Sequence, residues 1–262
     1  MGDFHNSFKS YTKFILTPII ERDDHYTWGR AYVVKFPEKT HYLPSVTTVL
    51  KVLDPDKFTH LEEKFGKERW GKILKDAGDR GTVMHRMLEV FLLEYDSTKN
   101  VEKALELALA VPDLEYSYLD PKVIKRGRNL FWNFYHENFW ERIKKCVGNE
   151  LFLWTLFKGG WAGTTDFVFE TLDGQIVMQD FKSSTSIKDK DDILGYKCQI
   201  SCYMYKYLDR FGVLPQRGEI LISNEEDEKI QKIVVEKEET PEYLKIFLEC
   251  LKKFQETHGI II

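Results

Sequence analysis

Two carboxylates and one ammonium group lie close together in a segment that the sequence predicts to be a β-hairpin, residues 163–184. Asp180 and Lys182 are two residues apart in an apolar strand, so both side chains point to the same face of the strand. If the two-residue turn Asp173-Gly174 joins the strands, Asp166 approaches Asp180 from the preceding strand. Two carboxylates beside an ammonium form a site for a hard divalent cation such as Mg²⁺ or Mn²⁺.

An Asp-x-Lys pair at a solvated strand end would show the same local pattern, so its neighbours along the chain decide its meaning. Five short pieces occur in a fixed order: GTVMH (81–85), Glu150, GTTD (163–166), DFK (180–182) and QISCY (199–203). This order resembles the PD-(D/E)XK nuclease superfamily, and more narrowly its RecB-type branch. The family pattern is G-x-x-x-H, Glu, G-x-x-D, (D/E)-x-K and Q-x-x-x-Y. Thr165 stands where the superfamily name has proline.

A second likeness lies upstream of these pieces. The segment YLPSVTTVL, residues 42–50, is similar to the P-S-V-T motif that precedes the nuclease core in the mitochondrial genome-maintenance exonuclease and related phage exonucleases. The resemblance therefore covers about residues 42–210. It implies a restriction-endonuclease-like fold with a central mixed sheet flanked by helices.

The resemblance assigns roles to individual residues. It implies that His85, Asp166, Asp180 and the backbone carbonyl of Phe181 bind one or two Mg²⁺ or Mn²⁺ ions, and that Lys182 orients the attacking water. From the residues alone, His85 has a structural alternative, because it flanks the apolar helix stripe of Met84, Leu88, Phe91 and Tyr95.

Three further residues are candidate catalytic groups. Glu150 opens a predicted strand and would touch the metal directly or through water, or would be a solvated strand-start glutamate. Gln199 and Tyr203 are four residues apart on one helix face, where they would reach the substrate phosphate or hold Lys182. Alternatively, Tyr203 packs in the core with Ile200 and Tyr207.

Nucleic-acid contacts are predicted at two places. Residues 122–145 carry seven Lys or Arg against two Glu and are interleaved with aromatic residues, a composition typical of single-strand binding. Lys125, Arg126 and Arg128 are the candidate phosphate contacts, although most aromatic residues at helical spacing belong to a core. Ser45, Thr47 and Thr48 offer hydroxyls to phosphates, with Ser45 also acting as a helix N-cap. Residues 56–96 could instead form an arch through which a strand is threaded.

The predicted fold class is α+β with a helical N-terminal elaboration. Two short strands within residues 14–34, around the polar turn ERDDHYTWGR, make residues 1–43 a β-hairpin region, and a loop over residues 35–44 follows the second strand. Helices are predicted at 45–53, 56–76, 79–96, 99–110 and 119–146. The core, residues 147–262, contains strands at 150–157, 160–170, 175–184, 217–223 and 230–236 and helices at 195–212 and 240–257. We expect one nuclease domain over residues 1–262.

Composition limits the protein's environment. The 262 residues are 43% hydrophobic, and no apolar run approaches the roughly 20 residues that span a bilayer, so no membrane partner is expected. The first residues lack the pattern of a signal peptide, which favours a cytoplasmic protein, in the host cytoplasm if phage-encoded, rather than a secreted one. The four cysteines are scattered, so we expect no disulfide framework and no iron–sulfur cluster.

These features predict a metal-dependent DNA exonuclease that acts on single strands or free ends in DNA replication, recombination or repair. An endonuclease or a duplex-end-processing nuclease with the same residues is the nearest alternative. A nucleic-acid-binding module on an inactive nuclease fold would require the loss of Asp166, Asp180 or Lys182, and all three are present. A phosphoesterase for small molecules would leave the basic stretch unexplained. The sequence identifies no protein partner.

Overall fold

The main sheet is mixed and has five strands. The computed structural model describes residues 19–260, so the predicted strand residues 14–18 and the N-terminal segment before them lie outside the described chain. Only β6 and β7 are parallel; the other neighbouring strands are antiparallel. The spatial order follows the chain: β4 (Ile143–Thr155), β5 (Trp161–Thr171), β6 (Ile176–Ser184), β7 (Arg217–Asn224) and β8 (Ile230–Glu236).

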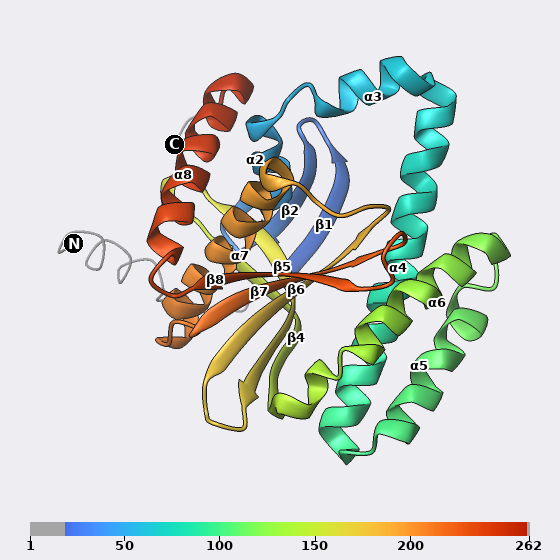
Figure 1. Ribbon diagram of the computed structural model, residues 1–262. Helices are drawn as coiled ribbons and strands as arrows, with labels where there is room; N and C mark the ends of the chain where they lie inside the picture. Colours follow the sequence, from blue (N-terminus) through green and yellow to red (C-terminus); the bar gives the residue numbers. More distant parts are fainter. Residues whose placement is uncertain (1–18, 261–262) are drawn as a thin grey trace.

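Helices cover both faces of this sheet (Figure 1). One face packs against α4 (Lys67–Thr98), α5 (Val101–Glu115) and α6 (Pro121–His136). The other packs against α2 (Val46–Leu50), α7 (Lys190–Phe211) and α8 (Thr240–His258). The alternation of β6 follows from this arrangement, because Val177 and Phe181 enter the α4–α6 core whereas Met178 enters the α7–α8 core. Asp180 and Lys182 therefore point toward α7, and they share one face of the strand as their spacing predicts.

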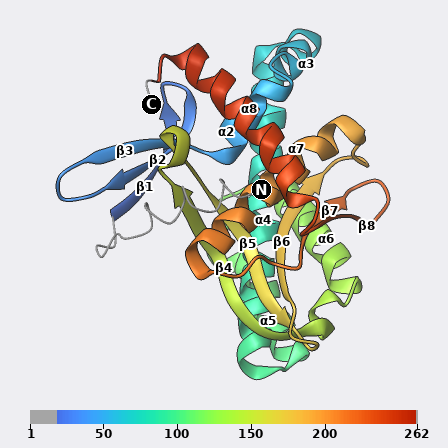
Figure 2. The same ribbon diagram turned by 90° about the vertical axis from the view of Figure 1, so that its left-hand side faces the viewer.

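A small antiparallel sheet stands beside the main one (Figure 2). It consists of β1 (Ile19–Tyr26), β2 (Gly29–Lys35) and β3 (Thr40–Pro44), so a third strand replaces part of the predicted loop over residues 35–44. Most of the predicted polar turn is strand, and only Thr27 and Trp28 form the turn. Tyr32, Val34 and Leu43 bury one face of this sheet against Ala162 of β5.

The predicted break between the first two long helices is wrong. The chain turns at Gly66, between α3 (Lys57–Phe65) and α4, and α4 continues through residues 77–78 without interruption. Gly66 has a φ of 80°, which glycine adopts without steric penalty. Gly78 instead sits inside the helix, where burial of Arg80, Gly81 and Val83 in the following turn offsets its low helix propensity.

The predicted helix over 119–146 is too long. It ends at His136, and Asn138 follows with a φ of 50°. A short 3₁₀ helix, η2 (Phe139–Arg142), then leads directly into β4. Most aromatic residues of the basic stretch are core residues, as the structural alternative predicted: Phe131, Phe134, Phe139 and Trp140.

The α+β fold class is confirmed, with N-terminal helices, a mixed five-stranded sheet flanked by helices, and a small N-terminal sheet. Two more 3₁₀ helices, η1 (Lys51–Leu53) and η3 (Phe157–Gly159), complete the described elements. Within residues 19–260, no helix is both long and apolar enough to cross a membrane.

Candidate active site

The site lies where β5 and β6 separate. Their ladder ends at the pair Phe167 and Gln179, and one step beyond it stand Asp166 and Asp180. The connection is a three-residue loop rather than the predicted two-residue turn, because Thr171 N–H donates to the carbonyl of Gln175 at 2.8 Å. A two-residue turn would shift the register by one residue and place Asp166 opposite Phe181. The extra loop residue therefore brings the two carboxylates together.

Three side chains from different elements form a potential metal site. His85 of α4, Glu150 of β4 and Asp166 of β5 each offer one ligand atom, and these atoms lie within 4.8 Å of one another. His85 Nδ1 is 3.7 Å from Asp166 Oδ2, and the same carboxylate oxygen accepts a 2.5 Å hydrogen bond from the backbone N–H of Phe181. Glu150, whose sequence interpretation was open, is thus placed beside the two predicted ligands.

Local backbone features allow these side chains to meet. Glu150 has a φ of 47°, an uncommon conformation for a non-glycine residue in a strand and one that often occurs at functional sites. Gly81 lies so close to β6 that an added Cβ would be 3.1 Å from Ser183 Oγ. The glycine of the G-x-x-x-H piece therefore lets α4 approach the sheet and bring His85 to the site.

Lys182 is held by a chain of polar contacts that leads into α7. Its ammonium forms an ion pair with Asp180 Oδ2, and Gln199 Nε2 donates to Asp180 Oδ1 at 3.1 Å. Gln199 Nε2 also lies 3.4 Å from the hydroxyl oxygen of Tyr203. Gln199 thus holds Asp180 rather than Lys182, while the ring of Tyr203 packs in the α7–α8 core. Glycine is required at position 163, beside Tyr203, since a Cβ there would lie 2.5 Å from the Tyr203 hydroxyl.

Burial sets the protonation states of the site. Burial, reinforced by the Lys182 ammonium, lowers the pKa of His85 to about 4, so its imidazole is neutral at pH 7. Burial raises the pKa of Asp166 and of Asp180 to about 6, against the opposing effect of Lys182. Burial and repulsion from Asp166 raise the pKa of Glu150 to about 7, with Arg22 opposing. The site therefore concentrates negative charge that a cation would stabilise.

Lys182 keeps its proton. Burial disfavours the charged ammonium, but attraction to Asp180 and Asp166 outweighs burial, so the pKa of Lys182 lies above its ordinary value. Its side chain remains 21% exposed. A fixed cation with partial access to solvent is suited to contact an anionic substrate.

A cavity of about 580 Å³ opens above these residues. Its walls come from α4, α7, the ends of β5 and β6, and the small sheet. Arg22 and Arg30 also line it, although both lie in the segment that the sequence predicts to be a polar turn. The predicted site residues that line it are Ser45, Thr47, His85, Glu150, Asp166, Asp180, Lys182, Gln199 and Tyr203.

The three hydroxyl residues of the segment 42–50 have different positions. Ser45 caps α2, accepting a 3.0 Å hydrogen bond from Thr48 N–H, and is buried although it borders the cavity. Thr47 is exposed at the cavity wall. Thr48 is buried, and its hydroxyl donates to the carbonyl of Arg30 at 3.1 Å. Thr47 is therefore the hydroxyl of the three that is open to a substrate.

The three basic candidates of α6 do not line the cavity. Arg126 forms a bidentate ion pair with Glu225, at 2.7 and 2.8 Å, and Arg128 contacts Asp113 at 2.7 Å. Lys125 is exposed. Contact of Lys125, Arg126 and Arg128 with DNA stays a prediction, and for the two arginines it would require these ion pairs to open.

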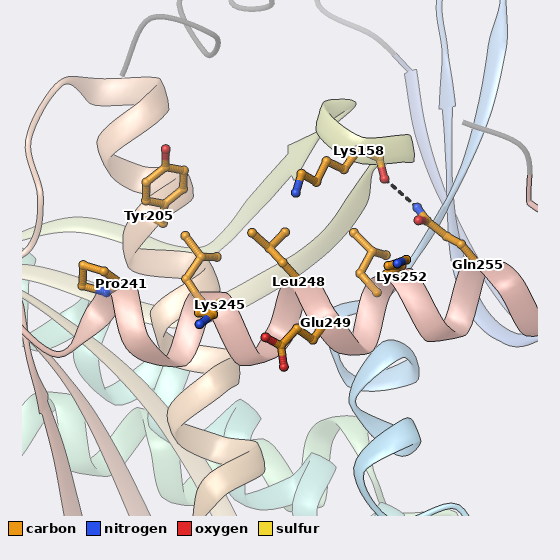
Figure 3. A pocket seen from close by; sticks show the side chains of 10 residues that line it. Lys158, Tyr205, Pro241, Lys245, Leu248, Glu249, Lys252 and Gln255 are labelled. Atoms are coloured by element: carbon orange, nitrogen blue, oxygen red, sulfur yellow. Dashed lines mark hydrogen bonds between the residues drawn. The ribbon is translucent and has the colours of Figure 1, made fainter. Parts of the chain in front are cut away.

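A second hollow, of about 730 Å³, lies along α8 (Figure 3). Leucine side chains of α8 and Tyr205 of α7 form much of its wall. Glu249 is the acid among its lining residues, so this hollow lacks the clustered oxygen ligands of the first cavity. The predicted absence of an iron–sulfur cluster stays a prediction; Cys198, Cys202 and Cys250 are buried and Cys146 is half-buried.

Comparison with known proteins links this geometry to a family. The family model described as the PD-(D/E)XK nuclease superfamily matches residues 57–259. A solved structure described as a "putative exonuclease" from Eubacterium rectale shares 16% identity over 70% of this chain and 69% of that chain, with a TM-score of 0.45. The protein SSO0001 shares 12% identity over 64% of this chain and 73% of its own, with a TM-score of 0.31. A search of curated proteins found no match.

Proposed function

Because the chain belongs to the PD-(D/E)XK nuclease superfamily, we propose that it is a metal-dependent deoxyribonuclease, specifically an exonuclease acting on single-stranded DNA or on free ends. Such an enzyme would serve DNA replication, recombination or repair. The observation that supports this proposal best is the meeting of His85, Glu150 and Asp166 beside the Lys182–Asp180 pair.

The donor set fits a divalent cation. A neutral imidazole and two carboxylates would hold Mg²⁺ or Mn²⁺, and imidazole suits Mn²⁺ in particular. Asp180 and the backbone carbonyl of Phe181 are proposed as further ligands. When bound, the ion polarises the scissile phosphate and makes hydroxide available from water near neutral pH.

Lys182 is the proposed catalytic cation. Its ammonium would orient the attacking water and offset the charge that develops on the phosphate oxygens. Asp180 fixes the position of this ammonium, and Gln199 fixes Asp180 through its 3.1 Å hydrogen bond. This chain of contacts keeps Lys182 at the cavity before substrate arrives.

The path of the chain around the cavity supports a preference for free ends. α3 runs from the side of α2 to the top of α4 (Figure 1). Among the described side chains of residues 59–79, none is fully buried, so this stretch does not belong to the core. A DNA strand that passes beneath this helical segment would have to enter by a free end.

End-labelled DNA tests this function directly. We expect Mg²⁺ or Mn²⁺ to support degradation of linear single strands, with single-stranded circles left intact and EDTA abolishing the reaction. The label position then reports the polarity. Cleavage of circles would establish an endonuclease with the same site, and DNA binding with no metal-dependent cleavage would overturn the enzymatic proposal.

A further inference from the structure

The inward face of the small sheet is apolar at one end and cationic at the other. At one end, Tyr32 and Val34 pack against β5 in an apolar cluster. At the other end, on the same face, Arg22 and Arg30 line the cavity that contains the metal-ligand cluster. The β1–β2 register pairs Arg22 with Tyr32, so the cationic end begins directly beside the apolar end.

Arg30 is anchored on the core of the protein. Its carbonyl accepts two hydrogen bonds, one from the backbone N–H of Ser45 and one from the hydroxyl of Thr48, both at 3.1 Å. Ser45 in turn caps α2. Ser45 and Thr48 of the segment 42–50 thus fix the backbone that carries this arginine, which gives them a role although both are buried.

The two arginines share a single counter-ion. Arg22 Nε and Arg30 Nε lie 2.9 and 2.7 Å from the same oxygen of Asp24. The three groups together carry one net positive charge. Each guanidinium contacts Asp24 through Nε, and a guanidinium carries five N–H donors, so donors remain that are suited to bind a phosphate. Both arginine side chains are partly exposed, at 51% and 41%.

We propose that Arg22 and Arg30 bind a backbone phosphate of the nucleic acid adjoining the scissile phosphate, so that the substrate strand lies between the small sheet and α4. This inference rests on the proposed nuclease function. Asp24 then serves as the shared counter-ion of the two guanidinium groups and leaves the cluster with one net positive charge. The competing interpretation is that Arg22, Asp24 and Arg30 only brace the small sheet.

The main experiment compares Arg22→Gln/Arg30→Gln with the wild type and with Lys245→Gln/Lys252→Gln, which removes the same number of positive charges from exposed positions of α8. Fluorescence anisotropy with a labelled single-stranded oligonucleotide measures affinity, and steady-state cleavage separates KM from kcat. We expect KM and Kd to rise about tenfold in the double variant with kcat little changed. The slope of log K against log salt should become shallower by about 0.7 for one lost phosphate contact.

Two further measurements separate the interpretations. All activity assays use saturating Mn²⁺, because the charge of Arg22 also acts on the proposed metal ligand Glu150. Under these conditions, hydrolysis of bis(4-nitrophenyl) phosphate, which has one phosphate, should be unaffected by the double variant. Asp24→Asn adds one net positive charge to the cluster, so phosphate binding predicts an unchanged or lower Kd for DNA. A structural brace predicts that Asp24→Asn weakens binding in the same way as loss of the arginines, and thermal melting records any unfolding.

An unchanged Kd and salt slope in the double variant would overturn the inference. So would a rise in Kd on Asp24→Asn that matches the double variant. Failure of the nuclease function gives a different result, namely a wild-type protein that cleaves neither DNA nor the small diester with metal, while the anisotropy comparison still reports on the arginines.

Discussion

At the scale of single residues, the candidate site consists of side chains that meet from four elements, α4, β4, β5 and β6. Asp166, Asp180, Lys182 and His85 stand at the spacings of a known pattern, and the structure brings them to one cavity. Arg22 and Arg30 could not be found in this way, because they belong to no motif and reach the cavity only through the placement of the small sheet. The position of Glu150 was ambiguous from the sequence, because it depends on a left-handed backbone conformation that the residue types do not predict.

Lys182→Met tests the catalytic cation. We expect kcat for single-stranded DNA to fall on the order of 10²–10³-fold, because a fixed positive group no longer faces the developing charge. Circular dichroism should show a retained fold. Lys35→Met is a matched control, since Lys35 is also a strand lysine paired with an acid, at 2.5 Å from Glu21, but lies outside the cavity lining. Equal kcat values for the wild type and Lys182→Met would contradict the assigned role.

Gly163→Ala tests the close approach of β5 to α7. The added Cβ would lie 2.5 Å from the Tyr203 hydroxyl and 2.6 Å from its ring, so the tyrosine must move. We expect a loss of about 1–3 kcal/mol in the free energy of unfolding, measured in urea, with a parallel loss of activity. Gly71→Ala is the control: this helical position has open space, so alanine should stabilise by about 0.5–1 kcal/mol. Similar effects at the two sites would argue against the packing explanation.

At the scale of elements, periodicity predicted which segments are helices and strands better than where they end. The break at Gly66 was missed because three other glycines interrupt the same helical pattern, and only a backbone φ distinguishes them. β4 begins seven residues earlier than predicted because residues 143–149, IKKCVGN, form an edge strand whose polar side chains obscure the alternation. The register of β5 and β6 depended on one loop residue, Leu172, that turn propensity did not reveal.

Glu219 ties several elements together and should make stability depend on pH. It is fully buried and contacts Arg142 of η2, Gln179 of β6 and Lys232 of β8. Burial alone would raise its pKa, but the Arg142 hydrogen bonds and charge outweigh this and lower the pKa of Glu219 to about 2. Its contribution to stability is therefore fully present above its ordinary pKa of 4.5 and is lost as the pH falls toward 2.

Glu219→Gln should reduce the free energy of unfolding at pH 7 by about 3 kcal/mol, near the low end for a buried ion pair because the cations are partly exposed. Urea denaturation at pH 7 and pH 3 measures the difference from wild type, which should narrow at pH 3. Glu170→Gln, which removes the exposed pair with Lys144, should cost less than about 1 kcal/mol at either pH. A difference for Glu219→Gln that stays constant between the two pH values would contradict the assigned charge interaction.

At the scale of the whole molecule, the sequence predicted the fold class but not how the two sheets and the helices pack together. The change from helical to strand periodicity near residue 150 is visible in the sequence, and it correctly indicates a helical half followed by a sheet. The cavity, however, combines residues from both sheets and from helices on both faces of the main sheet. That arrangement depends on long-range packing, such as Tyr32 and Leu43 against Ala162, which no local pattern encodes.

The proposed function depends on metal binding by His85, Glu150 and Asp166 together, and Glu150→Gln removes one carboxylate from this set. The measurement is the cleavage rate of end-labelled single-stranded DNA as a function of Mn²⁺ concentration, with Glu170→Gln as the control on the neighbouring strand. We predict that wild type and Glu170→Gln saturate at the same Mn²⁺ concentration, whereas Glu150→Gln requires roughly 10–100-fold more. Cleavage in EDTA, or the same Mn²⁺ dependence in all three proteins, would contradict binding of the catalytic metal by these three side chains.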